Sequence, residues 1–232
     1  MYFPAVTAWD ASGANFYRAP TGGWKVSKSL EIYGDGPGVA GAATGSILVP
    51  FDEQNPVFVL DSPTDLSNVY IHDLRISGVA GPAFSGADGI RFVAGATRKL
   101  SSVKLERVTV SGMCGKGIAL EAANAGDGAV AGLFMQDCEI SACRQAGVAL
   151  AFVFHACLVR CRIAANGQEG LSLTTGEIAL YSCTFDGNRT VGGTADLYLN
   201  GAAPATVAGC RFANFGSGAN PRACLMDSCG GA

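Results

Sequence analysis

The sequence predicts an all-β protein, a single-stranded parallel β-helix in which short strands and turns stack coil upon coil. Three observations predict it: segments that superimpose at a period of about 22 to 34 residues, apolar residues that alternate along each segment, and glycines between the segments. Such a period is typical of solenoids, whose repeats bury their apolar faces against their neighbours. Glycine interrupts the chain too often for amphipathic helices, and the spacing of leucine-rich repeats is absent.

Residues 1–66 are expected to form irregular opening coils. The strand LEIY leads directly into the turn GDGPG at residues 34–38, and SILVP and PVFVLD supply further short strands. A phosphate-binding loop is the alternative for GDGPG, but neither a helix pattern nor a Lys-Ser/Thr pair follows it.

Residues 67–232 are expected to form the regular coils, because the same apolar columns recur in each repeat. One strand supplies three inward columns: Ile71, Leu105, Met135, Leu158, Leu180 and Val207; Leu74, Val108, Cys138, Cys161, Cys183 and Cys210; and Ile76, Val110, Ile140, Ile163, Phe185 and Phe212. A second strand, usually led by glycine, supplies two more: Ile90, Ile118, Val148, Leu171, Leu197 and Cys224, then Phe92, Leu120, Leu150, Leu173, Leu199 and Met226. The alternation is that of half-buried strands.

This pattern resembles the right-handed parallel β-helix of the pectin-lyase-like superfamily, from about Tyr2 to the end of the chain. The resemblance implies one domain, 1–232, of about six to eight coils, and it implies an N-terminal capping helix that this chain lacks, so that a partner or a preceding segment covers the open end. The superfamily's catalytic motifs (WIDH, NTD, DD, GHG, RIK and DPHE) are absent. No catalytic residue can therefore be carried over.

Composition excludes several partners. The net charge is −3 and basic residues do not gather in a run, which argues against a nucleic-acid partner. The longest apolar run, residues 146–159, is too short to span a membrane, and no signal peptide is visible.

The nine cysteines are expected to be free thiols. Four share one inward column, where parallel Cα–Cβ bonds do not match disulfide geometry. A metal site built from His155, Cys157 and Cys161 is the alternative, although no CxxC pair supports it. Free thiols favour assembly in a reducing compartment, and a secreted or phage-associated particle is compatible with the fold class.

Charges on the outward side of the coils are expected to form ladders. Asp73, Arg107, Asp137 and Arg160 alternate in sign between successive coils, and a parallel outward column contains Arg75, Thr109, Glu139, Arg162, Thr184 and Arg211. His72, beside Asp73, is interpreted as a surface histidine rather than a general base.

The glycine-led strands present the face on which we expect function. Their outward positions begin with the leading residues Gly89, Gly117, Gly147, Gly170 and Asp196. The face is interpreted as small in the middle and polar at both ends, a shape that suits a long polysaccharide. The candidate catalytic residues are Lys116, Arg91, Glu121, Glu169 and Asp196, and the candidate substrate-binding residues are Asp88, Tyr198 and Asn200.

Two chemistries fit these residue types. A polysaccharide lyase needs a cation to stabilise a uronate carboxylate and a base to remove the α-proton. Lys116, Arg91 and Tyr198 supply such groups, and calcium is another source of positive charge; no metal-ligand cluster is predicted. A glycoside hydrolase instead needs two carboxyl groups across the scissile bond. Asp88, Glu121, Glu169 and Asp196 are candidates.

A non-catalytic structural or adhesive β-helix, similar to a tailspike, is the alternative function. The sequence signal of such a protein is an outward apolar stripe that holds a homotrimer together. A trimer would favour this structural role, and a monomer would favour the enzyme. The segment AFVFHACLV supplies candidates from Ala151 to Val159, with Phe134 and Tyr181 on adjacent coils.

Overall fold

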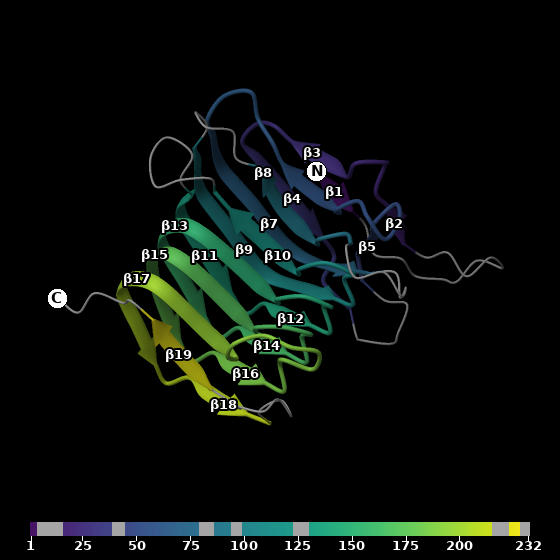
Figure 1. Cartoon of the computed structure of the whole chain (residues 1–232). Helices are drawn as coiled ribbons and strands as arrows, with labels where there is room; N and C mark the ends of the chain where they lie inside the picture. The colour runs from purple at the N-terminus through teal and green to yellow at the C-terminus, as the bar shows by residue number, and fades with distance from the viewer. Residues whose placement is uncertain are drawn as a thin grey trace.

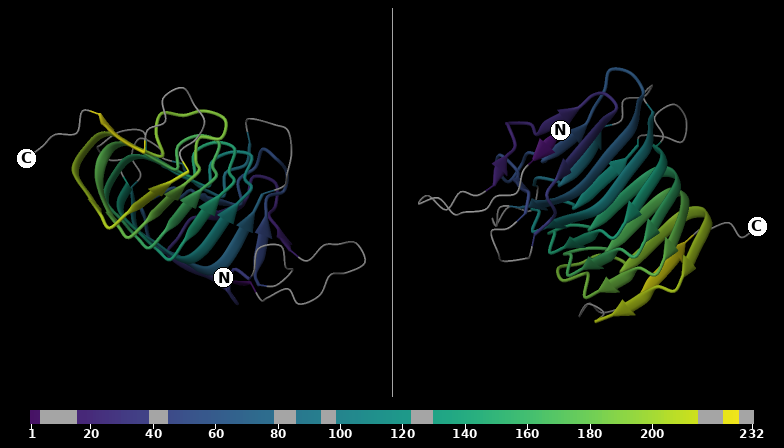
Figure 2. Two further views of the ribbon diagram at one scale, coloured as in Figure 1. Left: turned by 90° about the horizontal axis from the view of Figure 1, so that it is seen from below. Right: turned by 180° about the vertical axis from the view of Figure 1, so that it is seen from behind.

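The computed structural model describes residues 1–3, 16–38, 45–78, 86–93, 99–122, 130–214 and 223–227. In these ranges every regular element is a β-strand, and every strand pairing is parallel. Successive coils lie side by side along one axis, with the N-terminal coils at one end and the C-terminal coils at the other (Figures 1 and 2). The described residues therefore form a parallel β-helix, as predicted.

Each regular coil contributes to three faces, which we call the first, second and third face. The first face contains β3 (Trp24–Val26), β6 (Phe58–Leu60), β8 (Ile90–Val93), β10 (Ile118–Glu121), the first residues of β13 (Val148–Val159), β15 (Leu171–Tyr181) and β17 (Leu197–Ala208), and β19 (Cys224–Asp227).

The second face contains β1 (Tyr2–Phe3), β4 (Leu30–Gly34), the first part of β7 (Leu66–Ser77) and of β9 (Leu100–Ser111), β11 (Val130–Gln136), and the remainder of β13, β15 and β17. The third face contains β2 (Tyr17–Arg18), β5 (Ile47–Val49), the ends of β7 and β9, β12 (Glu139–Ser141), β14 (Arg162–Ala164), β16 (Thr184–Asp186) and β18 (Arg211–Ala213).

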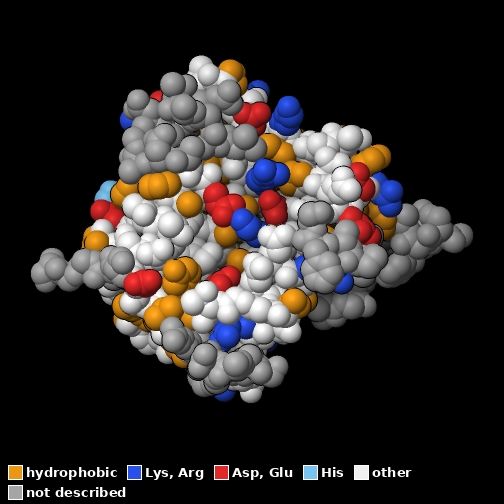
Figure 3. All heavy atoms as spheres, in the orientation of Figure 1, with side chains coloured by type: hydrophobic (Ala, Val, Ile, Leu, Met, Phe, Trp, Pro, Cys, Tyr) orange, Lys and Arg blue, Asp and Glu red, His pale blue; other side chains and the backbone are white. Residues whose placement is uncertain are grey.

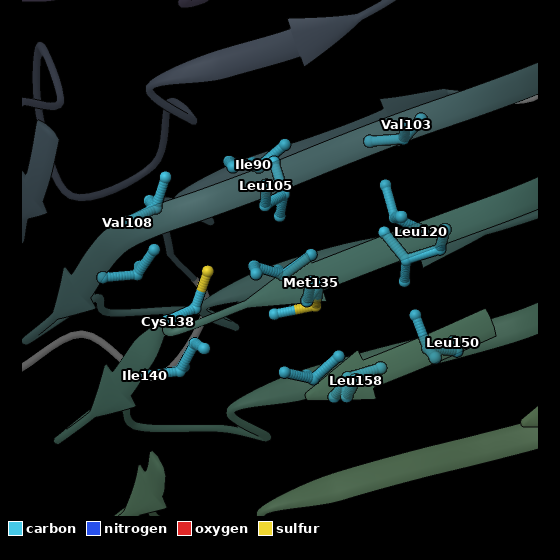
Figure 4. Packing of buried hydrophobic residues seen from close by; sticks show 14 of the residues in the cluster. Ile90, Val103, Leu105, Val108, Leu120, Met135, Cys138, Ile140, Leu150 and Leu158 are labelled. Carbon is cyan, nitrogen blue, oxygen red and sulfur yellow. The ribbon is translucent and has the colours of Figure 1, made fainter. Parts of the chain in front are cut away.

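The core lies between the three faces and consists of the predicted columns. Leu105, Met135 and Leu158 are fully buried one above the other, and Ile140 and Leu120 enter the same core from the other faces (Figure 4). Each buried side chain of this size stabilises the fold by about 1.5–3 kcal/mol. The predicted columns are confirmed in every coil except the last.

The last described coil leaves its column residues uncovered. Met226 is 49 % exposed, whereas Leu199, its neighbour in the same column, is fully buried. Cys224 is likewise exposed, and Phe212 is only partly buried. The reason is that, among the described strands, none packs beyond β18 and β19.

The bend between the second and third faces is made by one residue per coil in the left-handed conformation. Asp73, Arg107, Asp137 and Arg160 have φ between 50° and 55°. Arg107 donates to both carboxylate oxygens of Asp73 at 2.6 and 2.7 Å, and Arg160 donates to those of Asp137 at 2.8 and 2.7 Å. The predicted charge ladder is confirmed for these two pairs. Its residues form the bend itself, which the sequence did not predict.

None of the eight cysteines in the described ranges forms a disulfide bond, as predicted. Cys138, Cys161 and Cys183 are buried in one column and pack as small apolar groups. The part of the chain that the structure describes contains no group of three or more His, Cys, Asp or Glu placed to hold a metal ion. It also contains no helix long and apolar enough to cross a membrane.

Candidate functional site

The first face places the candidate residues in two outward columns. Parallel pairing aligns Arg91 with Ala119, Ala149, Ser172 and Tyr198 on successive strands. Two residues further along each strand, Glu121 aligns with Ala151, Thr174 and Asn200. From β8 to β17, the predicted order, polar at both ends and small in the middle, is therefore the order of the strands in space.

Four of the candidate residues meet around β8 and β10, and we call them the acid-base cluster: Asp88, Arg91, Lys116 and Glu121. The ammonium group of Lys116 donates to both carboxylate oxygens of Glu121, at 2.7 and 2.6 Å. The backbone N–H of Lys116 donates to Oδ1 of Asp88 at 2.8 Å. One residue in the turn before β10 thus binds carboxyl groups from two coils.

The carboxyl group of Asp88 has an unusual environment. Burial raises its pKa, and the nearby charge of Glu121 raises it further, while the Lys116 N–H and the charges of Lys116 and Arg91 lower it. Burial is the largest of these effects, so Asp88 holds its proton to a higher pH than an ordinary aspartate. The side chain of Glu121 is 45 % exposed. The cluster therefore combines two carboxyl groups in different environments with two cations.

The remaining candidates lie at the far end of the same face. Tyr198 is four strand steps from Arg91 in the same column, which corresponds to about 19 Å at the usual strand spacing. Tyr198 and Asn200 are partly exposed on β17. They can contact a polymer that lies along the axis, but they cannot act on the same bond as the acid-base cluster.

Asp196 does not lie on the exposed face, and the expectation that it does is wrong. It is 1 % exposed, and no donor in the described ranges forms a hydrogen bond with either of its carboxylate oxygens. It occupies the position of Gly170 in the preceding coil, just before the strand.

The physical reason is that this glycine position faces inward. A Cβ built on Gly117 would lie 2.5 Å from the side chain of Ile140, and one built on Gly147 would lie 2.9 Å from that of Ile163. The leading glycines Gly89, Gly117, Gly147 and Gly170 were expected to be outward. They instead allow successive coils to approach closely at this corner.

The middle of the first face is less open than expected. Ala119 is 2 % exposed and Ala149 is 3 % exposed. The ion pair between Lys116 and Glu121 joins the turn before β10 to the end of that strand, and so spans Ala119 between them. The accessible surface of this face therefore lies around the acid-base cluster and from Ser172 onward.

Glu169 has a structural partner. Its Oε1 accepts a hydrogen bond from the backbone N–H of Thr194 at 2.6 Å, so it ties two successive turns together. His72 is also more constrained than a surface histidine. Its Nδ1 lies 2.6 Å from Asp73, its Nε2 lies 3.1 Å from Glu31, and its ring stacks between Tyr33 and Tyr70. His72 lies on the second face, away from the acid-base cluster.

The surface carries no continuous region of one charge in the view of Figure 3, where acidic and basic side chains occur in small mixed groups among neutral ones. On the side seen in Figure 3, a ligand would therefore be bound by local contacts rather than by a general positive field.

The comparison with protein-family models agrees with this architecture. Residues 88–221 match the family model described as the right handed beta helix region. The match covers more than half of the chain, so the chain belongs to this family of right-handed parallel β-helices. No curated protein matches the sequence. Among solved structures, the chain is similar to the A-module of the mannuronan C-5 epimerase AlgE4 of Azotobacter vinelandii, with 14% sequence identity and a TM-score of 0.34. The alignment covers 99% of this chain and 86% of that one.

Proposed function

We propose that the protein binds a polysaccharide along its first face and cleaves it, as a polysaccharide lyase or a related glycan-degrading enzyme. The observation that carries this proposal is the acid-base cluster, in which Lys116 bonds Glu121 and Asp88 from adjacent coils. Tyr198 and Asn200 then hold the same polymer about 19 Å further along the axis, by strand spacing.

In the lyase version, Arg91 and Lys116 neutralise a uronate carboxylate, which acidifies the proton on the adjacent carbon. A base in the cluster takes that proton, and the electron pair of the broken C–H bond forms a carbon–carbon double bond. The C–O bond to the next sugar breaks, and Asp88 gives its proton to the leaving oxygen. Asp88 fits this donor role because burial raises its pKa.

In the hydrolase version, Asp88 is the general acid and Glu121 is the second carboxylate. Both versions draw on the acid-base cluster, but their products differ. A lyase forms an unsaturated uronate, which absorbs ultraviolet light, and a hydrolase releases reducing sugar without that absorbance.

The test is to incubate the protein with uronate and neutral polysaccharides, with and without calcium, and to record both signals. Lys116→Met and Glu121→Gln are expected to lower turnover by about 10²- to 10⁴-fold. Glu139→Gln is the matched control, because it removes an ion pair of similar geometry on the third face, where Arg162 donates to Glu139 at 2.8 Å. Absence of both signals with every polymer would reject the enzyme.

The alternative is a non-catalytic structural or adhesive β-helix that assembles as a homotrimer. Apolar side chains on the outside of the second face favour this structural role. Phe134, Cys157 and Val159 are outward and only partly buried, and Tyr181 is 42 % exposed. Light scattering separates the two: a trimer without glycan turnover supports the structural role, and a monomer with turnover supports the enzyme.

A further inference from the structure

The outward side of the second face contains two adjoining hollows, which we call together the lateral groove. The first has a volume of about 310 Å³ and is lined by Ser102, Lys104, Gly132, Phe134, His155 and Cys157. The second has a volume of about 190 Å³ and is lined by His155, Glu177, Ala179, Pro204 and Thr206. Because His155 lines both, the hollows follow one another along the helix axis from β9 to β17.

The first hollow exists because one coil has glycine where its neighbours have side chains. Ser102, Gly132 and His155 occupy corresponding positions on β9, β11 and β13, and their φ values are 55°, 85° and 56°. The backbone makes the same left-handed bend in each coil. At Gly132 no side chain projects from that bend, so a gap remains between the side chains of Ser102 and His155.

The floor of the groove is apolar and its borders are charged. Phe134 and Cys157 are neighbours in one outward column, and Ala179 follows in the next coil. Lys104 borders the first hollow, with its ammonium group 2.7 Å from Glu106. His155 Nδ1 lies 2.6 Å from Glu177 Oε2, between the two hollows.

We propose that the lateral groove is a second glycan-binding site, separate from the acid-base cluster and without a catalytic role. A sugar ring stacks on Phe134, and its hydroxyl groups bond Lys104, Ser102 and the His155–Glu177 pair. A second ring of the same chain enters the hollow beside Glu177 and Thr206. The choice of a glycan rests on the proposed function, whereas the location rests on the groove itself.

A subunit contact fits the groove less well than a glycan does. The centre of a protein–protein interface is depleted of charged residues. In the lateral groove, the His155–Glu177 pair lies at the centre, where the two hollows meet, and the side chain of His155 is 76 % exposed. Alternating apolar and hydrogen-bonding surface of this kind matches a sugar, which has C–H faces and hydroxyl edges.

Two variants of the full chain test the site. Gly132→Asn fills the first hollow, and asparagine adopts the left-handed conformation readily. Among the described residues, the atom nearest to a Cβ at Gly132 is the backbone nitrogen of Ser102 at 3.5 Å, so the variant is expected to fold. Phe134→Ala removes the stacking surface. Their controls are Gly112→Asn, at another left-handed glycine with free space and φ of 66°, and Tyr181→Ala, at an exposed aromatic residue of the same face outside the groove.

The measurement is isothermal titration with tetrasaccharides of galacturonate, mannuronate and glucose, together with light scattering. We expect two binding sites in the wild type for at least one tetrasaccharide. Gly132→Asn and Phe134→Ala are expected to abolish one of them, or to weaken it at least tenfold, while the controls and Glu121→Gln retain it.

The outcomes separate this inference from the proposed function. Loss of all binding in Glu121→Gln, with no effect of Gly132→Asn or Phe134→Ala, overturns the lateral site alone. Binding that depends on Gly132 and Phe134 but not on Glu121 supports the lateral site and counts against the first face. No binding of any tetrasaccharide overturns both. A wild-type oligomer that Gly132→Asn converts to monomer shows a subunit contact and also overturns the lateral site.

Discussion

The Nδ2 of Asn166 donates to the Oδ1 of Asn188 at 2.9 Å, and both side chains are fully buried in successive coils. The Oδ1 of Asn188 also accepts from the backbone N–H of Asn166 at 3.2 Å, and its Nδ2 donates to the carbonyl of Ile163 at 3.0 Å. The Oδ1 of Asn166 in turn accepts from the N–H of Cys143 at 3.0 Å. These amides hold the turns after the third face in register.

Asn188→Ala is therefore expected to destabilise the protein strongly. It leaves the backbone N–H of Asn166 without its partner in the interior, at about 1–3 kcal/mol for an unpaired group, and it also removes the hydrogen bond from Nδ2 of Asn166. Urea unfolding measures the loss. Gln168→Ala, at an exposed position of the neighbouring turn, is the control and should change stability by less than about 0.5 kcal/mol. Equal effects of the two variants would contradict the role of Asn188.

Gly147→Ala is expected to destabilise by about 1–3 kcal/mol through overpacking. The added methyl group would lie 2.6 Å from Nδ2 of Asn166 and 2.7 Å from the carbonyl oxygen of Gly170. Gly192→Ala is the matched control, because a Cβ there meets no atom of the described residues within 4 Å. Denaturant midpoints of the two variants should differ clearly, and a neutral Gly147→Ala would show that the coils can move apart at this corner.

Asp196→Asn is expected to stabilise the protein at neutral pH. Burial raises the pKa of the Asp196 carboxyl above 3.8, so the folded state binds this proton more tightly than the unfolded state. The wild type then loses stability as the pH rises from 3.8 through the folded pKa, and the loss persists at higher pH.

The asparagine variant lacks this titration. Thermal unfolding against pH should show the two proteins converging in acid and separating as the pH rises. Gln168→Ala, which changes an exposed side chain that does not titrate, should leave the pH dependence of the wild type unchanged. A constant difference between wild type and Asp196→Asn at every pH would contradict the raised pKa.

The thiols should differ sharply in reactivity. Burial raises the pKa of Cys143 to about 12, whereas Cys224 is exposed on the last strand. Iodoacetamide at about pH 8 reacts with thiolates and therefore should modify Cys224 and leave Cys143 intact until the protein unfolds. Peptide mass spectrometry reads both sites in one sample. Rapid labelling of Cys143 in the folded protein would contradict its burial.

The inward columns were predictable because a strand has a period of two and each coil repeats it. The burial of Leu105, Met135 and Leu158 could be predicted from that rule alone. The pairing of Arg107 with Asp73 followed from their alignment in the repeat. Contacts between neighbouring coils can thus be predicted by aligning the repeats of the sequence.

Features at the corners of the coil were not predictable from this period. The inward direction of Gly147, and hence the burial of Asp196, depends on how the turn enters the strand. The buried pair Asn166 and Asn188 was missed, although each follows the third-face strand by two residues, where Cys143 stands in the coil before. The lateral groove was also missed; its signal is Gly132 between Ser102 and His155 in one column.

The acid-base cluster was predicted in part. Asp88, Arg91, Lys116 and Glu121 were all named from strand ends and turns, but the sequence could not separate them from Tyr198, because separation along the axis depends on which strands are neighbours.

Because the strands of the first face keep a strict register, each coil adds a fixed length to that face. Arg91 and Tyr198 keep the same column, so the distance between them is set by the strands that lie between, at about 4.8 Å for each. Insertion or deletion of one coil would change the span between the two ends of the polymer site by one such step while leaving each end chemically intact. Selection on ligand length could therefore act by duplicating or losing coils, independently of the residues that bind.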